Sequence, residues 1–108
     1  HPIYHTQKYH SGVDIGASYG ASIVAADGGT VITAGAVSGY GNCVVINHGN
    51  GITTLYGHMS SIAVSSGQKV SKGQTIGYVG STGNSTGPHL HWEVTVNGVR
   101  QNPLNYAR

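Results

Sequence analysis

The chain has 108 residues, of which 18 are glycine and 38% are apolar, and its formal net charge is +2. The length indicates a single domain, residues 1–108, and the apolar content excludes a disordered low-complexity chain. The five Lys and Arg residues are scattered, which argues against a nucleic-acid partner. No apolar stretch is long enough to predict membrane insertion.

The sequence predicts an all-β domain of antiparallel strands around one core. In chain order, strand-like runs occur at residues 30–34, 42–47, 52–56, 75–79, 90–96 and 99–100. Hairpin-type turns are predicted at Asp27-Gly28-Gly29, Asn50-Gly51 and Asn97-Gly98. Residues 66–74 are predicted to hold one very short strand between glycine turns. Short helical turns are predicted only at residues 60–63 and 103–106, and Cys43 is expected in the core as a small apolar side chain.

Two pairs of polar residues are candidates for a metal site. His89 and His91 lie one residue apart, so in a strand they point to the same side. A locally extended segment from His10 to Asp14 would also put both side chains on one face, with Gly12 between them. His and Asp are ligands that Zn²⁺ accepts, and three protein ligands leave the fourth position open for water. The polar stretch 81–88 leads directly into His89, which is typical of functional loops.

Three motifs in this order identify a resemblance to a known family. They are His10-Ser11-Gly12-Val13-Asp14, then Tyr56-Gly57-His58-Met59, and then residues 80–91, which end in Pro88-His89-Leu90-His91. With the connecting residues 70–77 they resemble the zinc-dependent peptidoglycan hydrolases of the M23 type, the lysostaphin and LytM-like endopeptidases. The match covers nearly the whole chain, and three motifs at this spacing are specific.

The resemblance implies a fold and a set of site residues. The fold would be an antiparallel β-sheet with a narrow substrate groove that has the metal on its floor. His10, Asp14 and His91 would bind Zn²⁺, whereas His58 and His89 would be catalytic without binding it. Tyr4 lies where related enzymes often carry a tyrosine that hydrogen-bonds the oxyanion.

The implied reaction is hydrolysis of a peptide bond in the cross-links or stems of bacterial peptidoglycan. Such relatives include antibacterial enzymes. We expect His89 to act as general base and His58 to polarise the carbonyl and stabilise the oxyanion, because imidazole titrates in the required range. We expect a monomer that works outside the cytoplasm, in the cell wall or periplasm. Because no residue precedes His1 to occupy the fourth zinc position, we expect the domain to be active without further processing.

Two other functions compete with this interpretation. A catalytically inactive relative would bind peptidoglycan or activate another hydrolase, but such relatives usually lose metal ligands, and this sequence keeps all of them. Residues 70–79 are also similar to a biotinyl or lipoyl carrier. Lys69 and Lys72 lack the sequence context of a carrier lysine, so we do not favour that function.

Two polar residues outside the motifs are expected to be structural. Glu93 shares a strand face with His89 and His91 and could orient a ligand imidazole. We favour a solvated carboxylate at the end of the groove, or a partner for a Lys or Arg side chain. His48 lies beside the Asn50-Gly51 turn, and we expect an exposed turn histidine.

Overall fold

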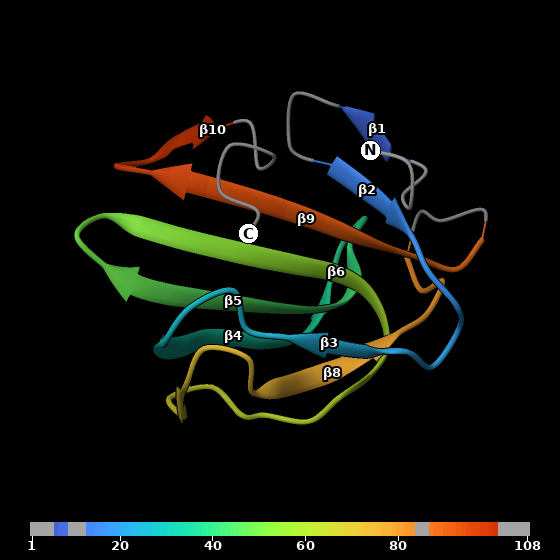
Figure 1. The fold of residues 1–108 in the computed structure, drawn as a ribbon, viewed down its shortest axis with the longest axis horizontal. Coiled ribbons are helices and arrows are strands. Elements are labelled where there is room, and N and C mark those ends of the chain that lie inside the picture. The colour runs from blue at the N-terminus through green and yellow to red at the C-terminus, as the bar shows by residue number, and fades with distance from the viewer. Residues whose placement is uncertain (1–5, 9–12, 84–86, 102–108) are drawn as a thin grey trace.

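In the computed structural model, the described residues are 6–8, 13–83 and 87–101. They form ten strands and no helix (Figure 1). The strands are β1 (Thr6–Lys8), β2 (Val13–Gly16), β3 (Ser22–Val24), β4 (Gly29–Val37), β5 (Gly41–Gly49), β6 (Ile52–Ile62), β7 (Lys69–Val70), β8 (Thr75–Val79), β9 (His89–Val96) and β10 (Val99–Gln101). The predicted all-β antiparallel class is confirmed.

The predicted strands are confirmed, whereas one predicted helical turn is wrong. The run predicted at 75–79 coincides with β8, and the other five predicted runs lie inside β4, β5, β6, β9 and β10. The helical turn predicted at 60–63 is wrong, because β6 continues through Ile62. There it pairs with β8, so pairing between distant segments overrides the local composition. The turn predicted at 103–106 lies outside the described residues.

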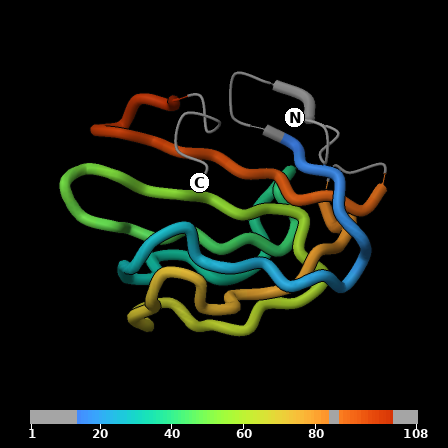
Figure 2. Tube along the Cα trace, viewed as in Figure 1, coloured from blue at the N-terminus to red at the C-terminus, as the bar shows by residue number. Residues whose placement is uncertain are grey.

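All strand pairs are antiparallel, and the main path through the sheet is β1-β2-β9-β6-β5-β4-β7. Strand β9 pairs along one edge with β6. Its other partners are β2, near its start, and β10, near its end. Strand β8 pairs with β3 and with the last part of β6. Figure 2 shows the start of β9 meeting β2 and the chain that follows β8 at one end of the molecule.

Two of the three predicted hairpins are confirmed. Asn50-Gly51 joins the paired strands β5 and β6, and Asn97-Gly98 joins β9 and β10. The φ values of both Asn50 (53°) and Gly51 (78°) are positive, which suits the right-handed twist of the flanking strands. Asp27-Gly28 is not a hairpin, because β3 pairs with β8 whereas β4 pairs with β5 and β7. Asp27 instead accepts a hydrogen bond from the Gly28 amide (2.8 Å).

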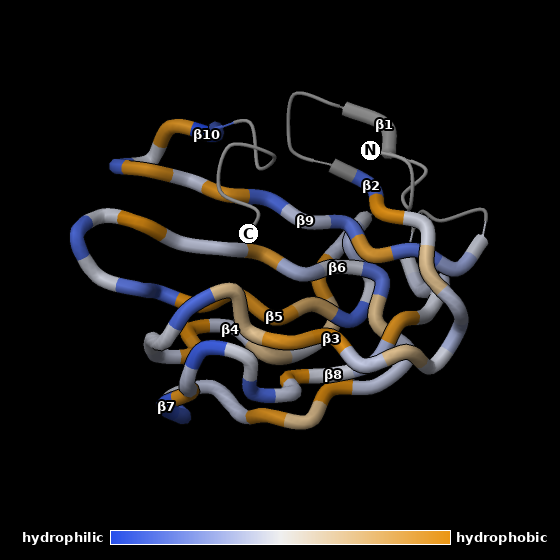
Figure 3. The backbone as a smooth tube through the Cα atoms, viewed as in Figure 1, coloured by the Kyte–Doolittle hydropathy of each residue, from blue (hydrophilic) through white to orange (hydrophobic). Residues whose placement is uncertain are grey.

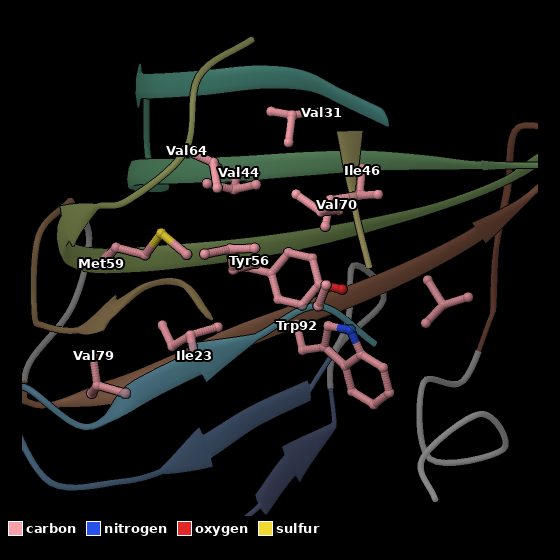
Figure 4. Packing of buried hydrophobic residues seen from close by; sticks show 13 residues of the cluster. Ile23, Val31, Val44, Ile46, Tyr56, Met59, Val64, Val70, Val79 and Trp92 are labelled. Carbon is pink, nitrogen blue, oxygen red and sulfur yellow. The ribbon is translucent and has the colours of Figure 1, made fainter. Parts of the chain in front are cut away.

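One cluster of buried apolar side chains lies inside the fold. Figure 4 shows residues from β3, β5, β6 and β8 in this cluster, among them Ile23, Ile46, Met59 and Val79. Cys43 is fully buried in β5, as expected. None of the described residues belongs to a helix long and apolar enough to span a membrane.

Candidate active site

Side chains of strand β9 alternate between its two faces, so that polar and apolar residues lie on opposite sides. Hydrophilic and hydrophobic residues alternate along it in Figure 3. Trp92 and Val94 belong to the apolar cluster, and Leu90 packs against it. His89, His91 and Glu93 occupy the other face. The structure therefore confirms that His89 and His91 lie on the same side.

Asp14 lies directly beside the histidine pair. It is the register partner of His91 across the β2–β9 ladder. Its Oδ1 atom is 2.6 Å from His91 Nδ1 and 3.5 Å from His89 Nε2. A carboxylate oxygen and an imidazole nitrogen therefore face one another at the start of β9. The remaining predicted ligand, His10, and the predicted oxyanion partner, Tyr4, both lie outside the described residues.

His58 reaches the same place from β6 through a β-bulge. Between the pairs Asn42–Met59 and Val44–Tyr56, two residues of β6 oppose one of β5. His58 has a φ of 61°, a left-handed conformation that is uncommon outside glycine, and its amide donates to the Tyr40 carbonyl (2.7 Å). Its ring centroid lies 4.7 Å from that of His89 and 5.9 Å from that of His91.

The chain after β8 holds both His58 and His89. His58 Nδ1 donates to the Thr82 carbonyl (2.5 Å), and His89 Nδ1 donates to the Gly87 carbonyl (2.8 Å). In the neutral form of each ring these bonds leave the lone pair on Nε2. The predicted role of residues 81–88, which was to deliver His89, agrees with the part of this loop that the structure describes.

Thr82 and Gly83 dock the loop against the sheet. Thr82 Oγ1 donates to the Met59 carbonyl (2.7 Å) and accepts from the Asn42 amide (3.0 Å). A Cβ atom on Gly83 would lie 2.4 Å from the Gly41 nitrogen and 2.7 Å from the Tyr40 carbonyl carbon. Only glycine permits this approach, so position 83 fixes where the Thr82 carbonyl meets His58.

Glu93 is not the solvated carboxylate favoured by the sequence. Only 4% of it is exposed, and its Oε2 atom accepts from His91 Nε2 (3.0 Å) and from the Tyr40 hydroxyl (2.6 Å). Its Oε1 atom lies 3.4 Å from Arg100 Nε, so the expected pairing with a basic residue is present as well. The sequence did not reveal Tyr40 or Arg100 as members of the site.

The pKa values follow from these contacts. Burial opposes ionisation of Glu93, but hydrogen bonds from His91 and Tyr40 and the charge of Arg100 outweigh it and lower its pKa. Burial and the bond to Glu93 raise the pKa of Tyr40 to about 12. For His91, burial is outweighed by the two carboxylates, which raise its pKa. Burial lowers the pKa of His58.

His48 lies away from this site and differs from its expectation. It is half-buried rather than exposed, with Nδ1 2.8 Å from the Gly28 carbonyl oxygen and Nε2 2.7 Å from Thr54 Oγ1. Thr54 in turn donates to the buried Tyr56 hydroxyl (2.7 Å). The ring links segments that the sequence does not show to be neighbours.

The described residues contain no group of three His, Cys, Asp or Glu side chains arranged to hold a metal ion. They do bring Asp14 and His91, two of the three predicted ligands, into direct contact. They also place the two predicted catalytic histidines next to this pair. The groups available for chemistry are therefore the Asp14 carboxylate and the His91 imidazole, which face one another, and the nearby imidazoles of His58 and His89.

Comparison with known proteins gives relatives over nearly the full chain. Mpg of Neisseria meningitidis, named a DD-carboxypeptidase/endopeptidase, is 47% identical over 99% of this chain. NlpD of Salmonella typhimurium, named a murein hydrolase activator, is 41% identical over 90% of it. The chain spans about a quarter of the length of each, 25% and 26%.

Solved structures agree with the fold. The catalytic domain of lysostaphin, an antimicrobial peptidase from Staphylococcus simulans, matches with a TM-score of 0.86 and 31% identity. That match covers 95% of this chain and 91% of that domain. A zinc-containing peptidase from Vibrio cholerae matches with a TM-score of 0.82 and 39% identity over 85% of this chain and 28% of that one. The model of peptidase family M23 matches residues 8–103, so the chain belongs to peptidase family M23.

Proposed function

We propose that this chain is a zinc-dependent endopeptidase that hydrolyses peptide bonds in the cross-links or stem peptides of bacterial peptidoglycan. One observation carries the proposal: three distant segments bring Asp14, His58, His89 and His91 together. Membership of a peptidase family and the names of the endopeptidase relatives support it. Residues 1–108 would form one catalytic domain.

The proposed metal ligands are His10, Asp14 and His91. Asp14 and His91 fit a zinc ion, because they offer one carboxylate oxygen and one imidazole nitrogen on adjacent strands. The family resemblance and the zinc-containing relative support the choice of metal. Zinc bound there would supply Lewis acidity, which polarises a carbonyl and makes water more acidic.

The other side chains would move protons and stabilise charge. His89 presents Nε2 toward Asp14, 3.5 Å from Oδ1, so it is placed to accept the proton of the attacking water. His58, held by Thr82 through Nδ1, would take a second proton from solvent on Nε2 and stabilise the oxyanion as an imidazolium. Tyr4 would donate a further hydrogen bond. His89 would then pass the proton that it took from the water to the leaving amine as the C–N bond breaks.

The substrate class determines where the protein would work. Peptidoglycan lies outside the cytoplasm, so we propose that the chain acts in the cell wall or periplasm. We propose that it acts as a monomer on peptidoglycan peptides. The names of relatives such as the peptidoglycan DD-endopeptidase ShyC of Vibrio cholerae support the substrate class.

An activator without catalysis is the second candidate, because NlpD is named a murein hydrolase activator. The retained side chains of Asp14, His58, His89 and His91 favour an enzyme over this alternative. A protein that binds zinc, releases no fragment from any wall and accelerates a second hydrolase would be an activator.

Mass spectrometry of soluble fragments from purified peptidoglycans of several cross-link types tests the proposal. We expect fragments with new amino and carboxyl ends, which disappear when a zinc chelator is added and return with added zinc. The His58→Ala variant serves as the control for contaminating hydrolases. Fragments that persist in chelator would contradict a zinc-dependent reaction.

A further inference from the structure

The carboxylate of Glu93 is buried beside His91, on the side of the ring away from Asp14. Its removal from water costs free energy of solvation. Only 4% of Glu93 is exposed, whereas the side chains of Asp14 and Arg100 are 23% and 50% exposed. A carboxylate out of water is unfavourable unless it is paired and hydrogen-bonded. What surrounds Glu93 therefore indicates what it does.

Three donors from three parts of the fold converge on this carboxylate. Oε2 accepts from His91 Nε2 (3.0 Å), on the same strand, and from the hydroxyl of Tyr40 (2.6 Å), in the turn between β4 and β5. Oε1 pairs with Arg100 Nε (3.4 Å) on β10. Two of these donors, Tyr40 and Arg100, hold Glu93 in place, and the third is the imidazole next to Asp14.

The His91 ring is thereby fixed at both nitrogens. Nε2 faces Glu93 and Nδ1 faces Asp14 at 2.6 Å. A carboxylate on the far nitrogen of an imidazole keeps the proton there, which leaves the near nitrogen with its lone pair for a cation. It also prevents the ring from turning about its Cβ–Cγ bond.

We propose that Glu93, held by Tyr40 and Arg100, is a positioning residue that fixes the ring of His91 so that Nδ1 binds the metal. This inference rests on the proposed function, because it takes His91 as a zinc ligand. Glu93 acts through His91 and does not touch the substrate.

Tyr40 extends the same arrangement to a second histidine. Its hydroxyl holds Glu93, and its carbonyl accepts from the His58 amide (2.7 Å). The Tyr40 ring centroid also lies 5.6 Å from that of His91. Tyr40 therefore contacts two parts of the site: Glu93, which holds the proposed metal ligand His91, and the backbone of the proposed catalytic residue His58.

The test measures zinc affinity by competition with a chromophoric chelator. We expect Glu93→Gln to raise the zinc Kd about 10- to 100-fold, and Tyr40→Phe to raise it by a smaller factor. The visible absorption of the Co²⁺-loaded protein should change in both variants. Asp27→Asn is the matched control, because it also removes one carboxylate but from an exposed bend, and it should leave Kd and spectrum unchanged.

A purely structural role for Glu93 predicts a different pattern. The Tm of the chelator-treated Glu93→Gln protein would then fall, while zinc Kd and the cobalt spectrum matched the wild type, and this outcome would overturn the inference. If Glu93→Gln fails to fold, Tyr40→Phe decides, since it removes one hydroxyl and leaves the contacts of Glu93 with His91 and Arg100. An unchanged Kd in that variant would overturn the inference as well.

Failure of the proposed function would be distinguishable from failure of this inference. A wild-type protein without measurable zinc affinity would contradict the proposed function itself. A wild-type protein that binds zinc and cleaves peptidoglycan, beside a Glu93→Gln variant with the same zinc Kd, would contradict only the role of Glu93.

Discussion

His48 and the site histidines lie at opposite ends of the β5–β6 pair, and they are held in different ways. His48 has both ring nitrogens on neutral oxygen atoms, those of Gly28 and Thr54. His91 lies between two carboxylates, Asp14 and Glu93. The first arrangement links the Gly28 bend to β6, whereas the second is the arrangement expected of an imidazole that binds a cation. The groups that contact each ring therefore distinguish a histidine with an expected structural role from one with a proposed role in the site.

His58 and His89 form a third class in this comparison. Each donates from Nδ1 to a backbone carbonyl, of Thr82 and Gly87. A carbonyl fixes the ring and its tautomer without adding a charge, which suits a group that must gain and lose a proton. The three environments therefore predict three different consequences of substitution.

The largest effect is expected at His91. His91→Ala should abolish both zinc retention and peptidoglycan cleavage, because it removes the nitrogen that faces Asp14. Zinc content after gel filtration and fragment release measure the two losses. His48→Ala is the control and should retain its zinc. Full zinc occupancy in His91→Ala would contradict the proposal that His91, unlike His48, is a zinc ligand.

His58→Ala should lower activity by at least about 100-fold while zinc stays bound, because the loss of one hydrogen-bond donor to an oxyanion costs activity on this scale. The same two measurements apply to this variant. Loss of zinc from His58→Ala would show that the division between ligands and catalysts is wrong.

Gly83→Ala should move the loop that holds His58. The new Cβ would meet the Gly41 nitrogen at 2.4 Å, at a φ of 75°, so the Thr82 carbonyl must shift. We expect a clear loss of activity, with zinc retained and stability lower by about 1–3 kcal/mol. Gly73→Ala is the matched control, because its φ is 82° but nothing lies within 4 Å of its Cβ. It should lose stability only. Equal activity in the two variants would contradict a positioning role for the loop.

The smallest effect on function is expected at His48. His48→Ala should lower the free energy of unfolding by about 1–3 kcal/mol, because it leaves the buried Thr54 hydroxyl without this partner. Peptidoglycan cleavage should stay at the wild-type rate. His48→Asn, which can still donate to Gly28, should lose less stability in urea unfolding. A selective loss of activity in His48→Ala would contradict its structural role.

The sequence predicted the strands and the histidine pair because both depend on local patterns. The alternation of His89, Leu90 and His91 was enough to place two imidazoles on one face. Hairpins at Asn50-Gly51 and Asn97-Gly98 follow from residues that tolerate positive φ.

The supports of the site were not predictable, since they depend on long-range pairing. Tyr40 is 53 residues from Glu93, and Thr82 is 24 residues from His58. The left-handed conformation of His58 follows from a bulge between β5 and β6, and the residues near His58 in the sequence do not predict that bulge. The usual exposure of carboxylates predicts a solvated Glu93, and only its partners explain its burial.

Diffraction data collected on both sides of the zinc absorption edge, from crystals of the zinc-loaded protein, would test the central claim most directly. We predict one zinc peak bound by His91 Nδ1, the Asp14 carboxylate and His10, with His58 and His89 outside the coordination sphere. A zinc ion ligated by His58 or His89, or one bound away from Asp14, would contradict the division of roles proposed for this site.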